Sequence, residues 1–150
     1  MREIKFSGKR ADNGEWVYGS LLNNVFYYDD PGEESRKPIH YIFDEELFNY
    51  YDYDSDEEIG LAMVLVEPNT VGQYTGLKDK NGVEIYEGDV VYFNSVYSMR
   101  DKANYQVYWK NKKCGFGIKM TKRPHTVKGM QPGKQFEITG NIHDNPELLD

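Results

Sequence analysis

The sequence predicts a mainly β protein of the small-barrel or sandwich class, with only short helical turns. Short runs of apolar and aromatic residues recur along the chain, and Gly, Pro and Asn-Gly turn signals separate them. This is the pattern of antiparallel strands joined by tight connections. The 13 tyrosines agree with this class, because a Tyr ring fits the half-buried surface of a strand while its hydroxyl stays in water.

Residues 1–69 are expected to form an N-terminal β-rich subdomain. Alternation places Ile4 and Phe6 on one face of a first strand. Tight turns are predicted at Asn13-Gly14 and at Asn23-Asn24, because Asn and Gly tolerate left-handed backbone. The other predicted elements are strands at residues 16–18, 25–28, 39–43 and 61–66, a short helix at residues 44–51 and an exposed acidic loop at residues 52–58.

Residues 70–150 carry the clearest turn signals. Asn81-Gly82 is predicted to be a type I′ hairpin turn, in which both central residues have positive φ. Asp89 is expected to cap a turn by accepting backbone N–H groups, and Asn145-Pro146 is typical of a helix start. The other predicted elements are strands at residues 83–86, 89–93, 105–109, 116–120 and 136–139 and a loop at residues 125–133.

The net charge of -7 is distributed unevenly. Residues 1–70 carry 16 acidic and 6 basic side chains, whereas residues 71–150 carry 9 acidic and 12 basic ones. Residues 102–134 contain nine Lys or Arg and no carboxylate, and residues 44–58 contain eight carboxylates and no Lys or Arg. The acidic total argues against a dedicated nucleic-acid coat protein, but the local potential on each segment decides what that segment binds.

The sequence predicts no catalytic, metal or cofactor site. Asp52, Asp54 and Asp56 alternate, but a calcium loop that begins at Asp52 would need Gly and Glu where Glu57 and Met63 stand. No two of the three histidines have the spacing of helical metal ligands. The single Cys114 has no disulfide partner in the chain, which suits a reducing cytoplasm. We therefore expect a cytoplasmic protein that is not an enzyme.

The basic segment, residues 102–134, is the candidate contact surface. Lysines neutralise phosphates and exposed rings stack on unpaired bases, so a basic aromatic hairpin is one way in which small barrels bind nucleic acid. Two other interpretations stand beside this one. In the first, the rings belong to the core and the lysines form the solvent-exposed face of the hairpin. In the second, the lysines contact an acidic protein surface, which can be residues 44–58 of the same chain or of a second chain. The candidate contact residues are Tyr108, Trp109, Lys110, Lys112, Lys113, Lys119, Lys122 and Arg123.

Three blocks of the sequence resemble the YopX family, small proteins encoded mainly by phages and prophages of low-GC Gram-positive bacteria. The blocks are MREIKFSGKRADNGEWVYGSL, VGQYTGLKDKNGVEIYEGDVV and FEITGNIHDNPELL. The resemblance implies an SH3-type barrel in residues 70–150, behind the N-terminal β-rich subdomain with its variable acidic insertion. It also implies a cytoplasmic location in the bacterial host cell. It brings no established activity and no catalytic residues.

From the residues and the resemblance we expect a phage or prophage accessory protein, most simply a non-enzymatic binding module for a host or phage protein. The alternative is nucleic-acid binding through residues 102–134. Opposed charged segments also permit a homo-oligomer, and no membrane association is expected, because the longest aliphatic run, Leu61–Val66, is far too short to span a bilayer.

Overall fold

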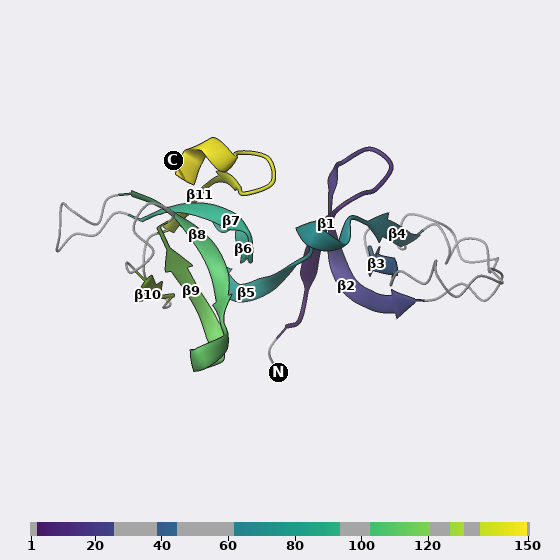
Figure 1. The fold of residues 1–150 in the computed structure, drawn as a ribbon, viewed down its shortest axis with the longest axis horizontal. Coiled ribbons are helices and arrows are strands. Elements are labelled where there is room, and N and C mark those ends of the chain that lie inside the picture. The colour runs from purple at the N-terminus through teal and green to yellow at the C-terminus, as the bar shows by residue number, and fades with distance from the viewer. Residues whose placement is uncertain are drawn as a thin grey trace. The chain divides into compact units, whose positions relative to one another are not determined.

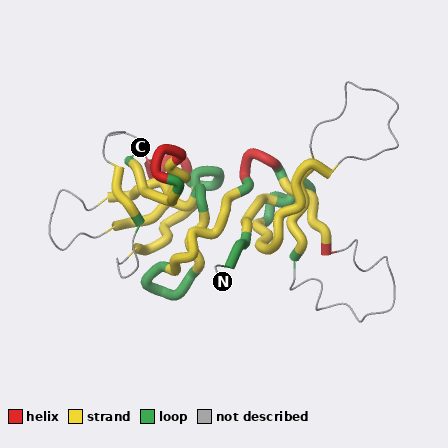
Figure 2. The backbone as a smooth tube through the Cα atoms, turned by 90° about the horizontal axis from the view of Figure 1, so that it is seen from below, coloured by secondary structure: helices red, strands yellow, loops and turns green. Residues whose placement is uncertain are grey.

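The chain folds into two compact β units. The computed structural model describes residues 3–25, 39–44, 62–93, 103–120, 127–130 and 136–149 (Figure 1). One unit is Ile4–Gly72, and the other is Gln73–Asp150 together with Met1–Glu3. Strands dominate both units and the only helical elements in the described residues are short turns (Figure 2), which confirms the mainly β class. None of the described helices is long and apolar enough to cross a membrane.

In the N-terminal unit, four strands pair antiparallel in the order β4-β3-β2-β1. A bridge between Arg10 and Val66 links the chain after β1 back to the end of β4. Backbone bonds from Ala11 N–H to the Leu65 carbonyl and from Glu67 N–H to the Lys9 carbonyl flank that bridge. The elements are β1 (Phe6–Lys9), β2 (Trp16–Val25), β3 (Ile39–Phe43), β4 (Met63–Val66) and the 3-10 turn η2 (Pro68–Thr70).

The core of this unit is small, and two glycines make room for it. It is formed by Val17, Ile42, Val64 and Val66. A Cβ at Gly19 would lie 1.9 Å from the Phe43 carbonyl oxygen, and a Cβ at Gly8 would lie 3.1 Å from Ile42 and Val66 side-chain atoms. Glycine lets β2 and β3 approach closely at Gly19.

The first strand begins later than the sequence predicts. β1 begins only at Phe6, and its buried positions are Ser7 and Gly8. Ile4, expected to share a face with Phe6, lies before the strand and is 62% exposed. Phe6 packs against the core of this unit, and Gly8, two residues further on, lies on the same face of β1 beside Ile42 and Val66. The predicted alternation therefore holds from Phe6 onward but does not extend back to Ile4.

Asn23-Asn24 forms a bulge, and the predicted turn there is wrong. β2 continues to Val25, and its register with β3 shifts between Leu22, opposite Tyr41, and Val25, opposite Ile39. Two residues of β2 thus oppose His40 alone, which defines a β-bulge. The strand predicted at residues 39–43 is confirmed as β3, whereas most of the helix predicted at residues 44–51, the acidic loop at residues 52–58 and residues 26–28 lie outside the described part of the chain.

The C-terminal unit contains a five-stranded antiparallel sheet with the order β10-β9-β8-β7-β11, and an antiparallel β5–β6 pair that is not part of this sheet. Its core is formed by Ile85, Val91, Phe93, Tyr105, Val107, Ile118 and Phe136. Among the described strands the sheet is open between β10 and β11, so the SH3-type barrel stays a prediction. The elements are β5 (Gly72–Lys78), β6 (Glu84–Tyr86), β7 (Asp89–Phe93), β8 (Ala103–Lys110), η4 (Asn111–Lys113), β9 (Gly115–Lys119), β10 (Val127–Gly129), β11 (Phe136–Asn141) and η5 (Pro146–Leu149).

The hairpin between β5 and β6 lies where the sequence predicts it, but its turn is of another type. Only Gly82 has positive φ there, at 85°. Gly82 N–H donates to the Asp79 carbonyl, and Asp79 N–H donates to the Val83 carbonyl. These bonds define a three-residue loop with a type I turn and a glycine bulge. Asp79 selects this turn, because its Oδ1 accepts the N–H groups of Asn81, at 2.7 Å, and Val83, at 3.0 Å.

Three further predictions on the C-terminal unit have clear outcomes. The loop predicted at residues 125–133 contains β10, a strand of three residues that carried no apolar signal. The cap predicted for Asp89 is confirmed, since its Oδ2 accepts the Tyr86 N–H at 2.7 Å. The helix start predicted at Asn145-Pro146 appears as η5, which begins at Pro146.

Candidate partner-binding surface

Six of the eight candidate contact residues lie on the hairpin formed by β8, η4 and β9 (Figure 1). The two strands pair antiparallel from Gln106 opposite Lys119 to Lys110 opposite Gly115. The turn η4 closes the hairpin, and Cys114 follows it with φ 46°, in the left-handed region. The Cys114 N–H donates to the Asn111 carbonyl. This short connection holds the exposed Lys112 and Lys113 at the tip of the hairpin.

Alternation along the two strands separates two faces. Tyr105, Val107 and Ile118 lie on the inner face in the core, and Tyr105 and Val107 are 0% exposed. Tyr105 therefore cannot contact a partner, although the sequence places it among the lysines. The outer face carries Tyr108 and Lys110 of β8 and Lys119 of β9. We call the outer-face and tip residues Tyr108, Lys110, Lys112, Lys113 and Lys119 the hairpin surface.

Lys119 covers the ring of Tyr108. The Lys119 Nζ lies 4.8 Å from the ring centroid, within the range of a cation–π contact. Lys119 lies opposite Gln106 in the register, and Tyr108 lies opposite Gly117. The two side chains are thus diagonal neighbours on one face, which brings long side chains into contact.

Lys110 leans over the sheet. A Cβ at Gly117 would lie 2.6 Å from the Lys110 Cε and 2.8 Å from its Cδ and Nζ, and a Cβ at Gly129 would lie 3.8 Å from the Nζ. Gly117 is paired with Gly129 across β9 and β10 and with Tyr108 across β8 and β9. The lysine stem therefore occupies the space that a side chain at Gly117 would fill, and its Nζ lies next to Gly129.

The lysines of the hairpin surface have no ion-pair partner within the described part of the chain. Elsewhere in the C-terminal unit, the Nζ of Lys80 lies 2.7 Å from Glu137 and that of Lys78 lies 4.0 Å from Glu84. Lys110 and Lys119 have no such carboxylate among the described residues, and neither do the lysines of the tip. The hairpin surface is thus a group of positive charges that no carboxylate of the described residues compensates.

Trp109 and Phe116 belong to the other face of the hairpin. They face each other across β8 and β9 and pack edge to face, with ring centroids 5.0 Å apart. The Trp109 N–H donates to Glu87 Oε1 at 3.0 Å. The Trp109 side chain is half-buried and packs against Phe116 on the face opposite the lysines, and the bond to Glu87 is made by its backbone.

The structure brings together Tyr108, Lys110 and Lys119 and leaves two candidate residues undescribed. Lys122 and Arg123 lie outside the described part of the chain. The sequence interpretation did not single out Gly117 and Gly129, which make space for the Lys110 stem. Glycine inside a strand signals close approach of another group, so the GFG run at residues 115–117 carried a usable signal.

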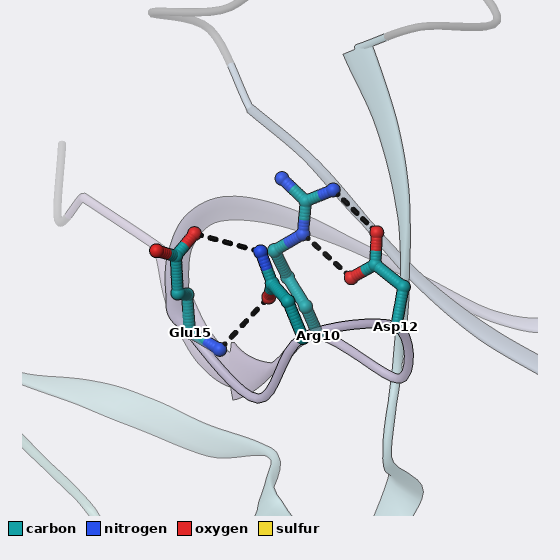
Figure 3. Close-up of polar contacts among 4 residues, drawn as sticks. Arg10, Asp12 and Glu15 are labelled. Carbon is teal, nitrogen blue, oxygen red and sulfur yellow. Dashed lines mark hydrogen bonds and ion pairs between the residues drawn. The ribbon is translucent and has the colours of Figure 1, made fainter.

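Two carboxylates outside the hairpin surface, those of Asp12 and Asp89, accept hydrogen bonds from residues of their own unit. At the β1–β2 turn, Arg10 Nε and Nη2 donate to Asp12 Oδ1 and Oδ2 at 2.8 and 2.6 Å (Figure 3). These bonds lower the pKa of the Asp12 carboxyl to about 2. Glu15 is held beside them by its bonds to Asn13. Asp12 is exposed and Arg10 is half-buried, so this ion pair lies at the surface of the loop.

The pKa of the Asp89 carboxyl is shifted in the opposite direction to that of Asp12. Burial raises the pKa of the Asp89 carboxyl to about 6, against the bonds that it accepts from the Tyr86 N–H and the Asn141 amide. Both bonds connect β7 to its neighbours within the unit. No second titratable side chain hydrogen-bonds this carboxyl among the described residues, and its role is to fix the turn before β7.

Taken together, the two units define an antiparallel β protein whose most distinctive surface is a basic hairpin. The sequence matches the model of the YopX protein family over residues 5–150, and the chain belongs to this family. Among solved structures, the fold is similar to the crystal structure of protein EF1440 from Enterococcus faecalis. The TM-score is 0.52, with 22% identity over 100% of both chains. No curated protein matches the sequence.

Proposed function

We propose that this YopX-family chain is a non-enzymatic binding protein that contacts an acidic protein partner through the hairpin surface. One observation carries the proposal, namely the four lysines of this surface, which have no carboxylate partner among the described residues. Charged groups arranged in this way increase the rate of encounter and select the partner more than they add affinity.

The partner is a host or phage protein, because we also propose that the chain is a phage or prophage accessory protein that acts in the bacterial cytoplasm. The family resemblance supports this origin. The single Cys114, exposed and free, supports a reducing compartment.

The C-terminal unit supports this function as a rigid scaffold, and we propose that it is an SH3-type barrel. The consecutive antiparallel pairing of β7, β8, β9 and β10, and the return of β11 to the other side of β7, support this assignment. An experimentally determined structure tests it directly: hydrogen bonds that close the sheet between its edges support the barrel, and two free edges contradict it.

Affinity capture from the bacterial host tests the proposed function. The bait is the full chain, and its matched control carries Lys110→Gln, Lys112→Gln, Lys113→Gln and Lys119→Gln. The wild type is expected to retain a protein after nuclease treatment and to lose it at high salt, since exposed charges are screened. Equal retention by the control contradicts the role of the hairpin surface.

Binding of single-stranded nucleic acid is the second candidate function, and the same lysines, which form no ion pair with a described residue, favour it. It predicts retention of single-stranded DNA or RNA with a steep dependence on salt. Replacing Lys112, Lys113, Lys119 and Arg123 is expected to abolish this retention. Failure to retain an oligonucleotide even at low salt excludes this candidate.

A further inference from the structure

We propose that Lys110 and Lys119 form an anion-binding subsite above the cross-strand row of Tyr108, Gly117 and Gly129, and that it holds a carboxylate of an acidic protein segment. This inference rests on the proposed function, because it specifies the chemistry of the same surface. It adds two features that a diffuse positive surface does not need: a defined position for the anion, and a structural role for Gly117.

The subsite follows from the directions of the two side chains. Lys110 lies opposite Gly115, and Lys119 lies opposite Gln106. The row that joins Tyr108 to Gly117 lies between these two positions. Lys110 leans into the row from the tip, over Gly117, and Lys119 leans into it from the other side, over the Tyr108 ring. Two ammonium groups therefore flank one row of the sheet.

The glycines determine the shape of the subsite. Gly117 and Gly129 are cross-strand partners and present no side chain above the sheet. Each lysine contributes three donors and no acceptor, and neither has a carboxylate partner among the described residues. Two like charges that flank one row of the sheet repel, so an anion bound between them removes this repulsion and accepts charge-assisted hydrogen bonds from both.

The arrangement of the aromatic rings favours a protein carboxylate over nucleic acid. Binding of single strands combines backbone phosphates with stacked bases. On the lysine face the only ring among the described hairpin residues is Tyr108, and Lys119 already covers it. Trp109 and Phe116 pack against each other on the opposite face. The lysine face thus offers charge without an open stacking surface, which suits acidic side chains.

A charge-conserving substitution tests the subsite. In Gly117→Ala the new methyl group takes the space of the Lys110 Cε and Nζ, so Lys110 must turn away while the net charge stays the same. The probe is a fluorescein-labelled oligoglutamate peptide, titrated by anisotropy into the full chain at low salt. Gly117→Ala, Lys110→Gln and Lys119→Gln are each expected to raise the Kd roughly five-fold, as for loss of one partly exposed ion pair.

Lys78→Gln is the matched control, because it removes the same charge from an exposed lysine of β5, outside the hairpin surface. It is expected to change the Kd by less than about two-fold, and unchanged circular dichroism and unfolding midpoints show that the variants are folded. If Gly117→Ala binds like the wild type and all lysine variants weaken equally, the charge acts diffusely and the subsite is wrong, while the proposed function stands.

Two other outcomes separate the partner classes. If oligothymidylate of matched charge binds more tightly than the peptide and Gly117→Ala weakens it, the anion is a phosphate and the carboxylate assignment is overturned. If the wild type binds neither probe at low salt, the subsite is rejected. In that case the capture experiment decides separately whether the hairpin surface binds a protein by other contacts.

Discussion

Asp79 determines the conformation of the β5–β6 turn through a single buried side chain. Its Oδ1 accepts two backbone N–H groups of the turn, and its Oδ2 lies 3.3 Å from the Ile138 nitrogen of β11. Burial opposes ionisation of this carboxyl, but the bonds from Val83, Asn81 and Ile138 outweigh it, and the pKa is lowered. One aspartate thus connects the hairpin to the sheet.

Asp79→Ala is expected to destabilise the C-terminal unit by about 2–4 kcal/mol, because it leaves several part-buried donors without an acceptor. Urea denaturation followed by Trp109 fluorescence in a Trp16→Phe background measures this loss. Asp12→Ala, which removes an exposed carboxylate from the N-terminal unit, is the control and should leave the transition unchanged. A loss below about 0.5 kcal/mol in Asp79→Ala contradicts the role given to these bonds.

The raised pKa of the Asp89 carboxyl predicts that this group stabilises the fold more at low pH than at neutral pH. Its pKa is raised from 3.8 to about 6 in the folded state, so folding favours the protonated carboxyl. This contribution is fully present below about pH 4 and is lost as the pH rises through about 6, with a total of about 3 kcal/mol. Asp79 contributes with the opposite sign, since its pKa is lowered and its stabilisation is lost as the pH falls.

The free energy of unfolding is measured from pH 4 to 7 for the wild type and for Asp89→Asn. The difference between the two isolates the contribution of the Asp89 carboxyl, because Asn does not titrate. The free energy of unfolding of the wild type, relative to the variant, should fall across this range and level off above pH 6. A difference that stays constant, or that grows as the pH rises, contradicts the raised pKa.

At the scale of elements, the sequence predicted strands where apolar and aromatic residues cluster and missed features that depend on a partner strand. β3, β7 and the β8–β9 hairpin follow from local alternation and turn residues. The Asn23-Asn24 bulge and the three-residue β10 depend on pairing with β3 and β9, which no local pattern encodes. The lysines of the site were predictable, but the positions of Lys110 and Lys119 above a glycine row required the register.

Gly19 provides a test of pairing at the scale of elements. A Cβ at this position would meet the Phe43 carbonyl oxygen at 1.9 Å, so β3 must move away from β2 in Gly19→Ala. We expect a loss of at least about 2 kcal/mol in the N-terminal unit, measured by Trp16 fluorescence in a Trp109→Phe background. Ser20→Ala, at an exposed neighbouring position, should stay within about 0.5 kcal/mol. Equal stability of the two variants contradicts the close approach.

At the scale of the whole molecule, the apolar cores of the two units have no residue in common among those that the structure describes. The two tryptophans report on them separately, since Trp16 is in β2 and Trp109 is in β8. The Gly19→Ala substitution should therefore lower the denaturation midpoint seen by Trp16 and leave that seen by Trp109 in place. Equal shifts in both transitions would indicate one cooperative unit.

The central claim is that the hairpin surface binds an acidic protein, and site-specific photo-cross-linking tests it most directly. A photoreactive residue replaces Lys112 at the hairpin tip, and in the control chain it replaces Val83, which is 53% exposed in the β5–β6 turn. In the bacterial host, the Lys112 position is expected to give a nuclease-resistant adduct with an acidic protein, and the Val83 position is expected to give none. The same adducts from both positions, or a nuclease-sensitive adduct from Lys112, would contradict the claim.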